Sequence, residues 1–254
     1  MQSSALLKLM YLVSPALPVG AYAYSQGQEY AVDAGWIKNV EDLEEWVLGV
    51  MENAITHLDL PCLLRLYHAW GKNDINAIHY WNQYLLASRE TAELLLEDEQ
   101  IGQALARLIE KISDEEGMEN LSSLNMTGET GNVKVETKQA RLFEVFPSLN
   151  THSQSDVSYI TLFAYCGVLW SIPENELMMG FTSAWLENQI AAATKTIPLG
   201  QSQAQKAILH LHEHIPRVVE KSLALGDDDI GLSLPGLTIS SCKHERQYSR
   251  LFRS

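Results

Sequence analysis

Apolar residues recur every three or four positions along most of this chain, and this spacing limits the folds that it can adopt. The clearest case follows Asn39, with apolar side chains at Val40, Leu43, Val47, Val50, Met51 and Ala54. That period places the apolar side chains on one face of a helix. Asn39 is positioned to cap the first turn, and the acidic residues after it lie at the positive end of the helix dipole. The pattern predicts an amphipathic helix that begins after Asn39.

Helical periods continue along the rest of the chain. They predict further helices over residues 74–88, 90–111, 174–194, 202–211 and 216–225. Pro173 precedes the third of these and Ser202 could cap the fourth. Residues 159–170 are apolar almost all round, which is typical of a central, buried helix. Because only short runs such as 133–135 alternate as strands do, we expect an all-α fold.

The expected organisation is a single-domain helical bundle over residues 1–240 and a tail over residues 241–254. Residues 113–156 interrupt the helical pattern, since they are polar and offer only Val145, Phe146 and a few others to bury. Such long segments inside a compact domain are usually either functional or disordered. We expect a surface excursion or insertion here, and the sequence leaves both alternatives open.

Charge and cysteine content exclude several classes of protein. The formal net charge is −14, so the chain repels phosphate and we expect no nucleic-acid partner. Cys62, Cys166 and Cys242 are scattered without a CxxC pair, which indicates neither a disulfide framework nor a thiolate zinc site and suits the cytoplasm. Pro15 and Pro18 break the apolar N-terminal run, and no uninterrupted apolar stretch reaches about 20 residues, so we expect neither a signal peptide nor a membrane span.

The last thirteen residues are basic and aromatic, in contrast to the acidic chain before them. If the segment is helical, one face collects Lys243, Arg246, Arg250 and Arg253, and another collects His244, Tyr248, Leu251 and Phe252. Arginine with tyrosine is typical of interface anchors, whereas disordered tails favour Glu, Lys, Ser and Pro. Simple fraying of a chain end is the alternative. We expect a partner-docking segment that contributes little to the core.

The sequence lacks the common catalytic motifs. It contains no GxxxxGK[ST] loop for a triphosphate, no G-x-S-x-G, no H-E-x-x-H and no Rossmann glycine fingerprint. One metal hypothesis stands: a helix would bring His210, His212 and His214 close enough to hold zinc, nickel or copper, although histidines at a helix end also interact favourably with the dipole. A hydrolase of another type would use Glu187 or Glu245 as its base. We favour a protein that is not an enzyme.

Four separated blocks of the sequence resemble the UreF family of urease accessory proteins. The blocks are residues 14–29, 185–189, 195–201 and 244–254. The first block contains the residues that we expect to form a fold-determining turn beside part of the interface: Pro15, Pro18, Gly20, Tyr24, Ser25 and Gly27. The resemblance covers about residues 5–112 and 157–254 and fades across 113–156.

This resemblance implies an all-helical, dimeric assembly factor that is not an enzyme and holds no resident cofactor. Such proteins bind the accessory protein UreD, also called UreH, and through it recruit the GTPase UreG, so that nickel is inserted into apo-urease. The implied contact with UreD is the tail, through His244, Glu245, Arg246, Tyr248, Ser249, Arg250, Leu251, Phe252 and Arg253.

The resemblance also suggests where the GTPase would bind. Our candidates are Lys195 and, more weakly, Glu187, on the helix expected over residues 174–194 and just after it. A cation near the end of a helix is also explained by the helix dipole alone. The histidines of residues 210–214 are not a family motif. An independent nickel carrier that uses them is therefore the alternative function.

Overall fold

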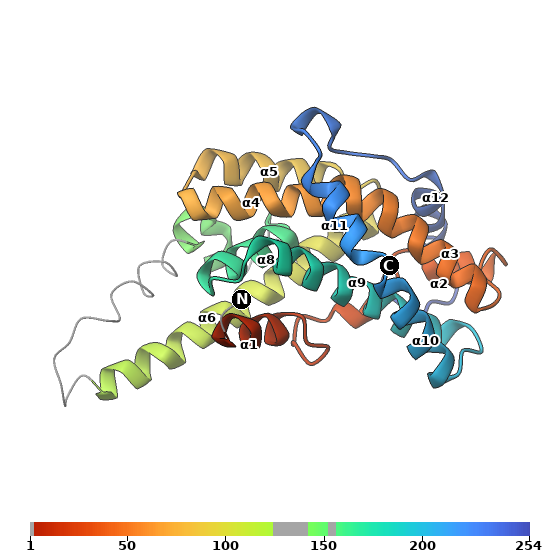
Figure 1. Cartoon of the computed structure of the whole chain (residues 1–254), viewed down its shortest axis with the longest axis horizontal. Coiled ribbons are helices and arrows are strands. Elements are labelled where there is room, and N and C mark those ends of the chain that lie inside the picture. Colours follow the sequence, from red (N-terminus) through yellow and green to blue (C-terminus); the bar gives the residue numbers. More distant parts are fainter. Residues whose placement is uncertain (1–2, 124–141, 152–155) are drawn as a thin grey trace.

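The computed structural model describes residues 3–123, 142–151 and 156–254, and these residues form helices and no strand. The all-α prediction is therefore confirmed for them (Figure 1). The elements are α1 (Ser3–Leu12), η1 (Ala21–Ala23), α2 (Gln28–Asp33), α3 (Val40–Val50), η2 (Met51–Asp59), α4 (Leu60–Lys72), α5 (Ile75–Ala87), α6 (Ala92–Ser123), η3 (Pro147–Thr151), α8 (Tyr159–Leu169), α9 (Glu174–Thr196), α10 (Gln201–His212), α11 (Ile215–Leu223), η4 (Asp227–Asp229) and α12 (Pro235–His244).

Local capping explains several helix starts. The Asn39 side chain accepts a hydrogen bond from the backbone N–H of Asp42, and Asp74 caps α5 in the same way. The expected cap at Ser202 is wrong, because α10 begins one residue earlier, after Gly200. There the Gln203 side chain reaches back and accepts a bond from the Gly200 N–H at 3.1 Å.

A single helical stretch connects α3 to α4 through the nine-residue π-helix η2. Of the described residues, this stretch, Val40–Lys72, is the one long and apolar enough to cross a membrane by length and composition. Within the molecule, 67% of its most apolar window is buried. The stretch forms part of the core, which explains its composition without a membrane.

The apolar helix α8 lies at the centre of the molecule, as expected. It packs against α4 and α6, and also against α1, α5 and α9. Phe163 and Leu162 are completely buried, and the Phe163 ring stands edge-on to Phe181 of α9 at 5.3 Å. Helices surround α8 on several sides, so it needs no polar face.

The segment 113–156 differs in part from the expected surface excursion. Helix α6 continues to Ser123, beyond the predicted end at residue 111. Leu142, Val145, Phe146 and Leu149 are all buried, and the Phe146 ring contacts His79 at 5.1 Å. These apolar residues recur at helical spacing, so they pack into the core. The short strand-like run at 133–135 lies outside the described residues.

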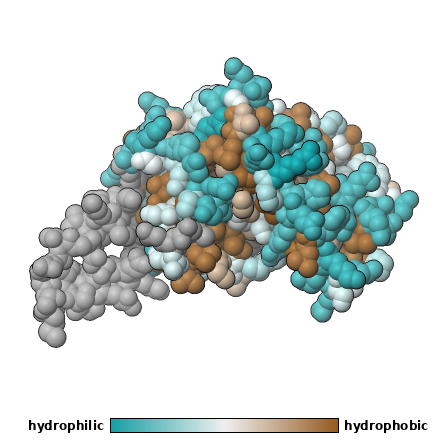
Figure 2. All heavy atoms as spheres, viewed as in Figure 1, coloured by the Kyte–Doolittle hydropathy of each residue, from teal (hydrophilic) through white to brown (hydrophobic). Residues whose placement is uncertain are grey.

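Hydrophilic residues cover most of the face seen in Figure 2, and hydrophobic ones form separate patches between them. At one end of the molecule, α12 lies near α2 and α3 (Figure 1). Its partner in close packing is α2, although about 200 positions separate the two helices in the sequence. This contact brings the first sequence block, residues 14–29, to the tail; we call this block the N-terminal motif.

Candidate partner-docking site

Gly27 allows α12 to lie directly against the N-terminal motif. Its φ angle is +77°, in the left-handed region that favours glycine. A Cβ atom at this position would lie 2.5 Å from the Ser240 Oγ and 2.8 Å from the Ser241 backbone nitrogen. Any side chain would therefore push α12 away. The expectation that Gly27 determines the fold has a physical basis in this contact.

The end of the tail is bound to the same motif. Ser25 donates two hydrogen bonds to the Ser254 carbonyl oxygen, one from its backbone N–H and one from its hydroxyl, each 2.6 Å long. The Arg253 N–H donates to the carbonyl of Ala23 at 2.7 Å. Two sequence blocks separated by 229 positions thus form one site.

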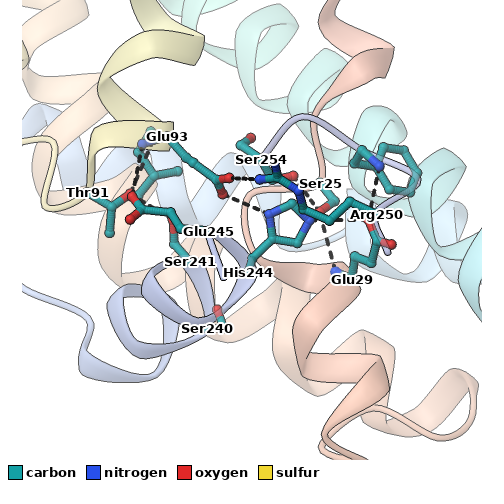
Figure 3. A network of polar contacts seen from close by, with 12 residues as sticks. Ser25, Glu29, Thr91, Glu93, Ser240, Ser241, His244, Glu245, Arg250 and Ser254 are labelled. Atoms are coloured by element: carbon teal, nitrogen blue, oxygen red, sulfur yellow. Dashed lines mark hydrogen bonds and ion pairs between the residues drawn. The ribbon is translucent and has the colours of Figure 1, made fainter. Parts of the chain in front are cut away.

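Glu29 is the centre of this site (Figure 3). One of its carboxylate oxygens accepts hydrogen bonds from the Phe252 N–H at 3.0 Å and from His244 Nε2 at 3.2 Å. The other accepts from the Leu251 N–H at 2.8 Å. Sequence reasoning placed Glu29 in the N-terminal block but gave it no role. A buried carboxylate must find donors, and here the tail backbone supplies them.

His244 lies fully buried between two carboxylates. Its Nε2 faces Glu29 at 3.2 Å and its Nδ1 faces Glu93 at 2.7 Å. Each ring nitrogen of His244 thus has a carboxylate oxygen within hydrogen-bond distance. Arg250 pairs with the second oxygen of Glu93 at 2.5 Å. We call Glu29, Glu93, His244 and Arg250 the tail ion cluster.

The tail does not form the two helical stripes considered above. Helix α12 ends at His244. After a last turn, the backbone N–H groups of Leu251 and Phe252 bond to Glu29, and that of Arg253 bonds to Ala23, so this part of the tail is not helical. Phe252 is buried in the body of the molecule. The expectation that the tail adds little to the core is therefore corrected: the tail is part of the packed structure.

Most of the predicted docking residues nevertheless face outward from this anchored segment. Tyr248 is fully exposed and Leu251 is 70% exposed. The other exposed candidates are Glu245, Arg246, Ser249, Arg250 and Arg253, of which Arg250 also pairs with Glu93. His244 and Phe252 are the candidates that face inward. The segment therefore separates into buried anchors and an exposed basic and aromatic surface.

A second buried carboxylate, Glu97, holds the last residue. Its two oxygens accept hydrogen bonds from the Ser254 hydroxyl at 2.6 Å and from Gln26 Nε2 at 2.8 Å. Burial raises the pKa of Glu97 to about 7. A cavity of about 120 Å³ lies beside it, lined in part by Arg89 and Trp185. The carboxyl group that holds Ser254 is thus partly protonated near neutral pH.

Lys195 lies next to the tail. Its Nζ is 5.2 Å from the centroid of the buried Phe252 ring, within the range of a cation–π contact. Glu187 is eight positions earlier on α9, about 12 Å away along the helix. There it lines a small cavity with Pro15 and Tyr22. The structure therefore brings Lys195 to the tail and Glu187 to the N-terminal turn.

The residues of the N-terminal turn divide between surface and interior. Pro15, Pro18 and Gly20 are exposed, and Gly20 has a φ angle of +80°. Tyr24 and Ser25 are buried, and the Tyr24 hydroxyl donates to Gln100 at 2.6 Å. The exposed half of the turn could contact a partner, while the buried half supports the tail.

The three histidines of residues 210–214 do not converge on one point. His210 Nδ1 lies 2.9 Å from Glu44, and His212 Nε2 lies 3.1 Å from the Ser183 hydroxyl. The His210 and His214 rings are in edge contact at 5.8 Å. Within the described parts of the chain, no group of three His, Cys, Asp or Glu residues is arranged to hold a metal ion.

Comparison with known proteins identifies the family of this chain. The family model UreF matches residues 37–212. The urease accessory protein UreF of Teredinibacter turnerae is 48% identical over 252 residues, which cover 99% of this chain and 100% of that protein. The proteins of the same name from Pseudoalteromonas translucida and Psychrobacter cryohalolentis are 42% and 41% identical, each over 98% of this chain and 94% of the relative. The chain belongs to the UreF family.

Proposed function

We propose that this protein is a cytoplasmic accessory factor for urease maturation whose tail binds a UreD/UreH-type accessory protein. Through that complex it recruits and gates a UreG-type GTPase, so that nickel reaches apo-urease. It acts as a homodimer, by binding rather than by catalysis, and nickel is its cargo. The observation that carries this proposal is the anchored tail, which exposes Tyr248 completely and Leu251 to 70%.

Anchoring makes the tail a better binding surface. A segment that is disordered before binding loses conformational freedom when it docks, and this loss weakens the complex. Here Glu29, His244 and Phe252 hold the backbone before a partner arrives. Exposed Tyr and Arg side chains on a fixed backbone have the chemistry of interface hot spots.

The GTPase contact rests on the position of Lys195. This side chain is exposed and lies against Phe252, so a partner bound at the tail covers or borders it. A GTPase recruited to the complex could therefore contact both Lys195 and the bound accessory protein. Glu187, about 12 Å away along α9, would mark the other edge of that surface.

The experiment that tests the proposal is capture of the UreD-type partner by purified variants. We expect Tyr248→Ala to weaken capture at least tenfold, because the ring has no role in the fold and a hot-spot tyrosine contributes about 2 kcal/mol or more. Lys243→Ala, an exposed cation on the same segment, is the matched control and should change capture less than threefold. Unchanged capture by Tyr248→Ala would contradict the proposal.

A further inference from the structure

A surface groove lies at the start of α12, away from the tail ion cluster. Its volume is about 350 Å³, and residues from α3, from the loop before α3 and from the start of α12 line it. We call it the Trp groove; its lining residues are Trp36, Ile37, Asp42, Glu45, Trp46, Gly49, Val50, Leu234, Gly236 and Leu237. None of these residues takes part in the site described above.

The groove exposes aromatic surface. Trp36 is 44% exposed, and its ring lies 6.2 Å from Trp46 at an angle of 42°. Tyr30 supports the Trp36 ring edge-on at 5.9 Å. An indole ring that is held in place on one side and exposed on the other can bind a side chain of a partner, which buries the ring or makes a cation–π contact with it.

The groove is open because two glycines line it. A Cβ atom at Gly49 would meet no atom within 4 Å, and one at Gly236 would meet only Trp46, at 4.0 Å. Larger residues at these positions would occupy the groove. The space is therefore accessible to a side chain from another protein.

The charge on the groove is negative. Asp42 has one carboxylate oxygen bonded to the Lys38 N–H, and it lies in the first turn of α3, where the helix dipole also explains it. Glu45 is different, because it lies beyond the first turn and has no hydrogen-bond or ion-pair partner among the described residues. An exposed carboxylate beside two indoles favours a cation with an aliphatic stem, as in Arg or Lys.

Helix α12 links the groove to the tail. The helix begins at the groove with Pro235 and ends at the ion cluster with His244, a length of about 15 Å. Between them α12 exposes Ile239, which is 50% accessible. One partner lying along this helix would reach both places, since a standard interface buries about 800 Å² on each side.

We propose that the Trp groove is a second contact for the partner that binds the tail, and that an Arg or Lys side chain of that partner enters it. The guanidinium or ammonium group lies over Trp36 and pairs with Glu45, and its aliphatic stem packs on Trp46. This inference rests on the proposed function. It adds to that function the chemistry of the partner surface: a cationic side chain about one α12 length from the tail contact.

The test uses full-length variants and the co-expressed UreD-type protein from the same organism as the probe. Trp36→Ala removes the ring, and Gly49→Met fills the groove. Gly49 does not have the positive φ angle that favours glycine, so methionine can adopt the same backbone conformation. Each should weaken capture at least tenfold, and Trp36→Phe should retain most of it. Glu45→Gln should weaken capture about threefold and reduce its salt dependence. Glu41→Gln, an exposed carboxylate on the same helix outside the groove, is the matched control and should have no effect.

The outcomes separate this inference from the function on which it rests. If Tyr248→Ala loses capture while Trp36→Ala and Gly49→Met keep it, the groove inference alone is wrong. If none of these three variants loses capture, the proposed function itself is wrong. Two further results would overturn the inference: equal effects of Glu45→Gln and Glu41→Gln, and groove variants that change self-association in size-exclusion chromatography while capture stays intact.

Discussion

Two histidine–glutamate pairs in this molecule have similar lengths and very different surroundings. His210 and Glu44 lie 2.9 Å apart, with 57% and 25% of their side chains exposed. His244 and Glu93 lie 2.7 Å apart, with 0% and 11% exposed. An exposed pair is worth about 0–1 kcal/mol, whereas breaking a buried pair leaves an uncompensated charge and costs about 3–5 kcal/mol. Distance alone therefore does not identify the pair on which the fold depends.

Deletion of residues 245–254 should produce the largest effect. It removes the two backbone donors of Glu29, the Arg250 charge beside Glu93 and the buried Phe252 ring. We expect the free energy of unfolding to fall by about 4 kcal/mol or more. Urea denaturation followed by circular dichroism measures it. A truncated chain as stable as the full one would show that the tail is not part of the packed structure.

His244→Ala should have the next largest effect, a loss of about 3 kcal/mol, because it leaves two buried carboxylates facing an empty position. The matched change is His210→Ala at the exposed pair. The same denaturation experiment compares them. Similar losses for both variants would remove the distinction between the two pairs.

Glu97 should make stability depend on pH near neutrality. Burial raises the pKa of this carboxyl group from 4.5 to about 7, so the folded state favours its protonated form. The stabilisation is complete below about pH 4.5 and is lost as pH rises through about 7; it corresponds to a few kcal/mol at most. Glu97→Gln should flatten that part of the stability profile. A profile with the same slope in Glu97→Gln would assign the pH dependence to another group.

His210→Ala should change stability by less than about 0.5 kcal/mol, since the pair with Glu44 is solvated.

Calorimetric titration of the intact protein with nickel should give no site tighter than micromolar, because Glu44 and Ser183 engage two of the three histidines separately. A tight isotherm that disappears in the triple alanine variant of His210, His212 and His214 would instead support the nickel-carrier alternative.

Local sequence signals predicted the helices well. Asn39 and the apolar positions after it specify the start and the buried face of α3 within a few residues, and the apolar composition of 159–170 was enough to place α8 in the core. Ser202 is not the cap of α10, because the Gln203 side chain accepts a hydrogen bond from the Gly200 N–H at the start of the helix. Such competition between neighbouring caps depends on side-chain geometry rather than on residue type.

The candidate site was predicted only in part. The sequence identified both blocks of the site, but it did not indicate that Gly27 would admit α12 or that Glu29 would bind the backbone of Leu251 and Phe252. These contacts join positions more than 200 residues apart, and no periodic pattern records them. A glutamate in the N-terminal motif, with a basic segment at the other end of the chain, was the available sequence signal.

The anchoring of the tail before any partner binds is the central feature of this structure. Hydrogen exchange of the isolated protein, read at individual backbone amides, tests this directly. We predict slow exchange at Leu251 and Phe252, whose N–H groups bond to Glu29, and loss of that protection in Glu29→Ala. Rapid exchange throughout residues 245–254 of the unchanged protein would contradict the account.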